Sequence, residues 1–129
     1  MKKILLIDAH SLLHRCYHAV PDLTAPDGTP SGALYGAANI LLRILQEEKP
    51  EYCAAAFDLP TATFRKQAFE DYKAHRPKTP DALSVQLKEA PNLFAALGIP
   101  IFSKEGFEGD DVIATLAEKF SYQIPVEIL

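Results

Sequence analysis

The sequence has few features of a membrane protein, a disulfide-bonded protein or a thiolate-metal protein. Its only two cysteines, Cys16 and Cys53, stand in apolar surroundings without metal-ligand spacing, so we expect buried thiols in a reducing compartment. No apolar stretch approaches the length of a transmembrane helix, and Asp8 interrupts the N-terminal apolar run too early for a signal peptide. We therefore expect a cytoplasmic protein that does not bind a membrane.

An excess of positive charge is also missing. The 13 lysines and arginines stand against 17 acidic residues, which gives a net charge of −4. This balance argues against a protein whose whole surface coats nucleic acid, although it leaves room for a local basic patch beside gathered acids. The rest of the composition is ordinary, because 129 residues of which 48% are hydrophobic can bury the core of one domain.

Short apolar runs alternate along the chain with segments of helical periodicity. The second strand contains three consecutive alanines, which suggests helices packed closely on both of its faces. Ser31 and Thr79 are plausible N-caps, Pro91 should kink or split its helix, and Gly98 should end it. We expect strands at 3–8, 52–58, 99–102 and 126–129, and helices at 11–20, 31–48, 79–97 and from 109 or 110 to about 120. This order predicts a three-layer α/β/α sandwich with a mainly parallel central sheet.

Acidic residues stand at the ends of three of these strands. Asp8 and Asp58 are the last residues of the first two, and Glu108, Asp110 and Asp111 follow the third at the start of a helix. Ligands of parallel α/β sheets bind beyond the carboxyl ends of the strands, so all five acids should share one edge. Such oxygen-rich clusters suit Mg²⁺ or Mn²⁺, and two such ions can activate water and stabilise the leaving oxygen of a phosphodiester.

Each acid also has a simpler interpretation. An aspartate after a strand is often a helix N-cap, and acids in the first turn of a helix are favoured by the macrodipole. Three separate caps explain the coincidence of three strand ends poorly, so we favour a metal site. His10, His14 and His18 share one helical stripe, but no soft ligands accompany them, which argues against zinc.

Residues 59–78 are basic and aromatic. Charge runs are usually solvated surface, but lysine and arginine beside a metal site can hold a polyanion, and aromatic rings can stack on unpaired bases. The segment contains Arg65, Lys66, Lys73, His75, Arg76 and Lys78 interleaved with Phe64, Phe69 and Tyr72.

Four stretches together resemble the N-terminal 5′-nuclease domain of bacterial DNA polymerase I, within the flap-endonuclease family. They are LLIDAHSLLHRCYHA within 4–19, GTPSGALYGAANIL at 28–41, AAAFDLPTATFRKQAFEDYKAHRPKTP at 54–80 and GFEGDDVIATLA at 106–117. They occur in the family's order and spacing over nearly the whole chain.

The resemblance implies a hydrolase that removes nucleotides or flaps from DNA 5′ ends. It implies a first metal site formed by Asp8, Asp58, Glu108, Asp110 and Asp111, with Mg²⁺ as cofactor and Mn²⁺ as a substitute. Asp58 and Asp110 would be catalytic together with Lys73 and Arg76, and residues 59–80 would form a basic arch for the single strand. His14 stands where the family more usually has tyrosine. The implied DNA contacts are Arg15, Arg65, Lys66, Tyr72, Lys73 and Arg76.

Related proteins continue into a second aspartate pair and a duplex-binding region, so residues 1–129 would be one incomplete domain of marginal stability. We expect a monomer, with a polymerase module in the same longer chain as one arrangement. Two alternatives stay open, a non-catalytic DNA-binding remnant and a PIN-type ribonuclease. A Rossmann-like nucleotide-binding protein fits poorly, because no glycine-rich loop follows Asp8.

Overall fold

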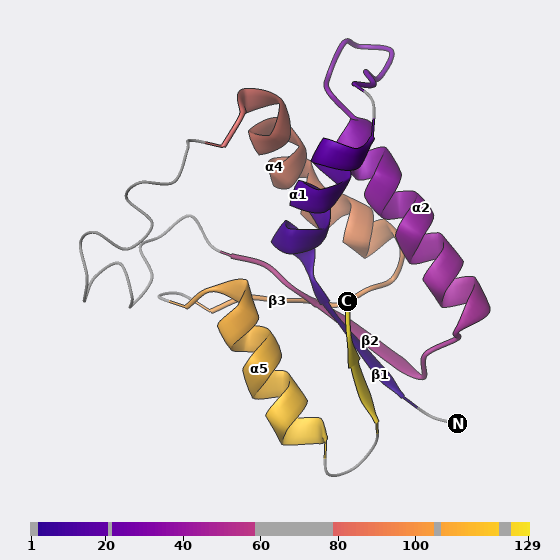
Figure 1. Cartoon of the computed structure of the whole chain (residues 1–129), viewed down its shortest axis with the longest axis vertical. Coiled ribbons are helices and arrows are strands. Elements are labelled where there is room, and N and C mark those ends of the chain that lie inside the picture. The colour runs from indigo at the N-terminus through magenta and orange to yellow at the C-terminus, as the bar shows by residue number, and fades with distance from the viewer. Residues whose placement is uncertain (1–2, 21, 59–78, 105–106, 122–124) are drawn as a thin grey trace.

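The computed structural model describes residues 3–20, 22–58, 79–104, 107–121 and 125–129, without the side chain of Asp110. Figure 1 shows how these segments are arranged. In chain order the elements are β1 (Ile4–Asp8), α1 (Ala9–Ala19), α2 (Gly32–Glu47), β2 (Tyr52–Ala56), α4 (Asp81–Ala96), β3 (Ile101–Phe102), α5 (Gly109–Phe120) and β4 (Val126–Ile128). No helix in these ranges is long and apolar enough to cross a membrane.

The described strands form one parallel sheet in the order β3-β2-β1-β4. β1 and β2 lie at its centre and pair along their full lengths, from Ile4 opposite Tyr52 to Asp8 opposite Ala56. The predicted parallel sheet is therefore confirmed. Because all four strands run the same way, their carboxyl ends meet at a single edge.

Helices cover both faces of the sheet, which confirms the predicted three-layer sandwich. α1, α2 and α4 lie on one face, where Leu5, Ile7 and Ala55 point into the larger core. α5 lies on the other face, where its Ile113 packs against Ile4 and neighbouring strand residues. The alternation of side chains along β1 explains this division, since successive residues of a strand point to opposite faces.

Small residues allow close packing around the sheet. In β2, Ala55 is fully buried toward the three-helix face and Ala56 toward α5, as the alanine run predicted. Between α1 and α2, a methyl group added at Gly36 would stand only 2.8 Å from Cγ2 of Val20 and 3.2 Å from Cβ of Cys16. The two helices therefore meet almost backbone to backbone at this position.

Several expected element boundaries were wrong. The first helix begins at Ala9 rather than at Ser11, since Asp8 caps it by accepting a hydrogen bond from the Ser11 N–H at 3.2 Å. β2 ends at Ala56, so Asp58 lies just beyond the strand and is not its last residue. The two outer strands are also shorter than expected, because β3 pairs only along Ile101–Phe102 and β4 only along Val126–Ile128.

Helix termini and the internal proline also differ from expectation. The N-cap of α4 is Pro80 rather than Thr79, and Ser31 occupies the N-cap position of α2 without a side-chain cap hydrogen bond. α4 continues through Pro91 instead of splitting, because Ala90 and Phe94 on either side of it are fully buried in the core. Gly98 ends this helix as predicted, with a φ of +76° that favours glycine.

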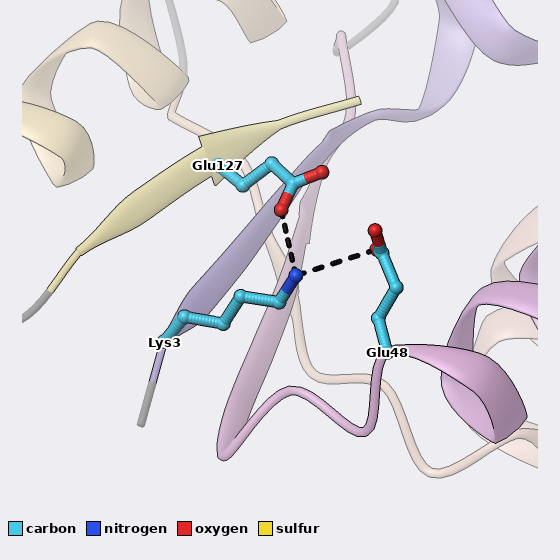
Figure 2. A network of polar contacts seen from close by, with 3 residues as sticks. All are labelled: Lys3, Glu48 and Glu127. Atoms are coloured by element: carbon cyan, nitrogen blue, oxygen red, sulfur yellow. Dashed lines mark hydrogen bonds and ion pairs between the residues drawn. The ribbon is translucent and has the colours of Figure 1, made fainter. Parts of the chain in front are cut away.

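An ionic cluster lies at the opposite end of the sheet, before the first residue of β1. The Lys3 ammonium donates to Glu127 of β4 at 2.8 Å and lies 3.6 Å from a carboxylate oxygen of Glu48, at the C-terminus of α2 (Figure 2). The hydrogen bond to Glu127 raises the pKa of Lys3. These exposed contacts join an outer strand to a helix far from the acidic edge.

Candidate metal centre

The carboxyl edge of the sheet brings together residues that are distant in the sequence. Asp8 ends β1, and its register partner is Ala56, two positions before Asp58. The backbone N–H of Gly109, the first residue of α5, donates a hydrogen bond to Oδ1 of Asp58. The ends of both central strands and the start of α5 therefore form one locus, as the positions of the acids predicted.

Two acids of the third group lie within the first turn of α5. Glu108 is the N-cap and is 5% exposed, and its N–H donates to Oδ2 of Asp111 at 3.0 Å in a capping-box arrangement. The N–H of Asp111 donates in turn to the carbonyl oxygen of Glu108 at 3.1 Å. The positive end of the helix dipole favours acids at this position.

The simpler interpretation as helix caps is thus confirmed for some of the acids. Asp8 caps α1, while Glu108 and Asp111 close the start of α5. A carboxylate has two oxygens and about four lone-pair sites, so accepting a capping hydrogen bond is compatible with binding a cation. The structure therefore supports the capping role without excluding the metal-binding role.

The donor chemistry fits a hard divalent cation. The acids at this edge offer only carboxylate oxygens, which suit Mg²⁺ and Mn²⁺ better than metals that prefer thiolates. Among the described residues, however, no three histidine, cysteine or acidic side chains are grouped closely enough to hold an ion. The side chain of Asp110 lies outside the description, and the five-ligand set remains a prediction.

His10 is a residue of this edge that the sequence reasoning did not assign to the site. Its Nδ1 lies 3.7 Å from Oδ2 of Asp58, and its ring makes an edge-to-face contact with Phe57 at 5.7 Å between centroids. Its position two residues after Asp8 was a usable signal, because the first turn of a helix after β1 must stay near the strand end. The spacing of the histidine stripe by itself bears only on a zinc site.

An open groove of about 420 Å³ runs from the acidic edge along α4. Its walls are mostly apolar, and Asp58 and Lys88 are the charged residues of its lining. The lining residues are His10, Phe57, Asp58, Leu87, Lys88, Pro91, Ile101 and Ser103. The groove therefore leaves open space next to the Asp58 carboxylate.

Most of the predicted DNA-binding residues cannot be placed. Arg15 is exposed on α1, where it is available to solvent. Arg65, Lys66, Tyr72, Lys73 and Arg76 lie outside the described residues, as does the arch segment apart from Thr79 and Pro80. The roles assigned to these residues therefore stay predictions.

The thiols behave as the sequence suggested. Cys16 is buried and Cys53 half-buried, and both are free. Burial raises the pKa of both thiols, that of Cys53 to about 11. Neither cysteine lies at the acidic edge.

A parallel α/β sandwich with acidic residues from different elements at the carboxyl edge of its sheet is the class that the fold and the site define. The chain belongs to the family of the 5′-3′ exonuclease N-terminal resolvase-like domain, whose sequence profile matches residues 3–129. This membership confirms the resemblance that the four sequence stretches indicated.

Curated relatives are similar over nearly all of this chain. The chain is 40% identical to a 5′-3′ exonuclease of Aquifex aeolicus, over 94% of its own length and 42% of that protein. It is also 40% identical to DNA polymerase I of Bacillus subtilis, over 97% of its own length and 14% of that protein. The chain thus spans less than half of these relatives.

Solved structures confirm the fold. The T5 D15 protein co-crystallised with metal ions superimposes with a TM-score of 0.75 at 16% identity, covering 98% of this chain and 48% of that one. T5 5′-exonuclease with bound divalent zinc ions gives a TM-score of 0.68 at 19% identity, covering 98% of this chain and 48% of that one. At such identities the likeness concerns the fold alone.

Proposed function

We propose that this chain forms the first-metal half of a 5′-nuclease that hydrolyses DNA phosphodiesters as a 5′-3′ exonuclease or 5′-flap endonuclease. The observation that carries the proposal is the convergence of Asp8, Asp58 and the first turn of α5 at one sheet edge. Relatives named 5′-3′ exonuclease and DNA polymerase I support the same activity.

The cofactor we propose is Mg²⁺, with Mn²⁺ as a substitute. Asp8, Asp58, Glu108, Asp110 and Asp111 would hold it, and their oxygen chemistry together with metal-bound neighbours of this fold supports that assignment. A bound divalent ion supplies charge neutralisation and lowers the pKa of water. The protein would orient the carboxylates toward the ion. For Asp58, the hydrogen bond from the Gly109 N–H contributes to this orientation.

The end of β4 lies beside the proposed first half-site. The Leu129 N–H donates to the carbonyl of Leu6 at 2.8 Å, and its carbonyl accepts from the Asp8 N–H at 3.1 Å. A chain that continued from Leu129 would therefore start beside Asp8.

DNA with 5′ ends or flaps is the proposed substrate. Residues 59–78 directly follow Asp58 in the sequence, and Asp58 lines the groove of about 420 Å³. Arg15, Arg65 and Lys66 would bind backbone phosphates, Tyr72 would stack, and Lys73 and Arg76 would stabilise charge at the scissile phosphate. A neighbour of this fold in a pseudo-enzyme-product complex with DNA and metal ions supports the substrate class.

The test is Mg²⁺-dependent cleavage of a 5′-flap DNA by the full-length natural protein. We expect Asp58→Asn and Asp110→Asn to lower the cleavage rate by about a hundredfold or more, since each removes charge from the centre. Asp22→Asn, at an exposed loop residue, is the matched control and should leave the rate unchanged. Unchanged rates in both site variants would refute the site.

The same assay decides between the proposed nuclease and the alternatives. Flap binding that weakens with salt, without cleavage in Mg²⁺ or Mn²⁺, would identify a DNA-binding remnant. Cleavage of an RNA flap in preference to DNA would identify a PIN-type ribonuclease. A polymerase module in the same chain and a monomeric state belong to the proposal as well, and the polymerase relatives support the former.

A further inference from the structure

Asp58 is contacted from two sides by groups on different helices. Its Oδ1 accepts the hydrogen bond from the Gly109 N–H at the start of α5, and its Oδ2 lies 3.7 Å from Nδ1 of His10 in the first turn of α1. The side chain of Asp58 is 38% exposed, so solvent alone would let it rotate. One hydrogen bond and one imidazole nitrogen therefore face the two oxygens of the same carboxylate.

The ring of His10 is itself oriented by the protein core. It meets Phe57 edge to face at 5.7 Å, and Phe57 meets Phe94 of α4 in the same manner at 5.2 Å, with interplanar angles of 83° in both pairs. Phe94 is fully buried and Phe57 is 6% exposed. Such edge-to-face pairs have a preferred geometry, so the three rings connect the core of the three-helix face to the Asp58 carboxylate.

We propose that His10 is a positioning residue for Asp58, which holds the carboxylate in the orientation that binds the divalent ion. The inference rests on the proposed metal site. With hydrogen on Nδ1, a neutral imidazole can donate to Oδ2 while the Gly109 N–H occupies Oδ1. Mg²⁺ demands near-ideal octahedral geometry, so an acid that rotates is a poor ligand.

The distance of 3.7 Å is longer than a made hydrogen bond, which spans about 2.7–3.2 Å. Hydrogen bonds of this kind are often long in the ligand-free state and tighten when the site is loaded. Groups that orient metal ligands typically change metal affinity by about 10- to 100-fold when they are removed. His10 acts here through Asp58, without contact to substrate.

The test compares Mn²⁺ affinity, measured by electron paramagnetic resonance on the full-length natural protein, between His10→Ala, His10→Asn and His10→Gln. Asp58→Asn supplies the background from other sites. We expect His10→Ala to weaken the Asp58-dependent binding by about 10- to 100-fold. His10→Asn should restore most of the affinity, because its amide nitrogen stands near the place of Nδ1, whereas His10→Gln should not.

Controls separate positioning from packing. His18→Ala removes an exposed histidine from the same helix and should change neither affinity nor thermal stability. The thermal midpoint of unfolding of each variant, measured without metal, shows whether the substitution destabilises the fold. His10→Asn loses the ring contact with Phe57 as His10→Ala does, so equal loss of affinity in both variants would assign His10 to packing and overturn the proposal.

Three other results would also overturn the proposal. Unchanged Mn²⁺ affinity in His10→Ala, while Asp58→Asn abolishes binding, would refute the positioning role but leave the metal site standing. A selective loss of Zn²⁺ over Mg²⁺ in His10→Ala would make His10 a direct ligand. If Asp58→Asn itself leaves Mn²⁺ binding unchanged, the proposed metal site fails, and the positioning role fails with it.

Discussion

At the scale of single residues, Asp58 illustrates how the acidic edge depends on neighbours that are remote in the chain. Its hydrogen-bond donor, the Gly109 N–H, is 51 positions away. A methyl group added at Gly109 would stand 3.0 Å from Oδ1 of Asp58 and 3.5 Å from the carbonyl oxygen of Ala56. The absence of a side chain at Gly109 is therefore what lets the start of α5 approach this carboxylate.

Gly109→Ala should consequently displace Asp58 while leaving α5 intact. Alanine favours helices by about 1 kcal/mol over glycine, so we expect little loss of overall stability. Divalent-metal affinity should fall by about tenfold, because the Asp58 carboxylate must move to relieve the contact. Isothermal titration with Mn²⁺ measures the affinity, and a wild-type value in the variant would contradict the account.

The two thiols give a prediction that depends on pH. Burial raises the pKa of Cys53 from an ordinary value of 9.0 to about 11. At pH 8 its thiolate population, and so its rate of alkylation by iodoacetamide, should be roughly a hundredfold below that of an exposed thiol. The folded state holds its thiol proton more tightly, so unfolding free energy should fall as pH rises from about 9 toward 11. Alkylation of native protein at the rate of a denatured control would contradict this.

At the scale of elements, the most restrictive packing lies between α1 and α2. Gly36 faces Val20 at 2.8 Å and Cys16 at 3.2 Å, counted from the position of an added methyl group. Neither neighbour is the end of a long flexible side chain. An additional methyl group must therefore separate the two helices or shift their ends.

Gly36→Ala should destabilise the fold by about 1–3 kcal/mol, the usual range for overpacking a close contact. The helix propensity of alanine would offset part of this cost. Urea unfolding followed by circular dichroism measures the change, with Ala38→Gly on the same helix as a reference for propensity alone. A stabilised Gly36→Ala variant would show that the helices are less tightly packed than described.

Most helices and strands could be predicted from local patterns, and the exceptions have identifiable causes. The apolar run 4–7 and the alanines of β2 indicated buried strands, and the periodicity of α2 and α5 set their lengths. Pro91 does not split α4 because burial of Ala90 and Phe94 outweighs one missing backbone donor. The predicted length of β3 was wrong because pairing with β2 limits the strand to Ile101–Phe102. Strand pairing cannot be inferred from a local sequence pattern.

At the scale of the whole molecule, the two faces of the sheet are covered unequally. Three helices pack on one face, whereas α5 alone covers the other among the described elements. On that second face Ile128 of β4 is 57% exposed and Phe102 of β3 is 44% exposed. These apolar residues on either side of α5 agree with the expected marginal stability, which stays a prediction.

The location of the site could be predicted from the sequence, but the contacts within it could not. Parallel topology made it possible to place Asp8, Asp58 and Glu108 at one edge, since strand ends must coincide there. Which oxygen faces which donor could not be inferred, because it depends on the approach of α5 to β2 and on the ring contacts of Phe57. His10 was missed for this reason.

The central claim is that carboxylates from three strand ends hold one divalent ion. The most direct measurement is a crystal structure of the protein grown with Mn²⁺, with anomalous diffraction recorded near the manganese edge. The account predicts an anomalous peak between Asp8, Asp58 and the Glu108–Asp111 turn, at about 2.0–2.2 Å from carboxylate oxygens. A map with no peak at that edge, while manganese occupies another part of the molecule, would contradict it.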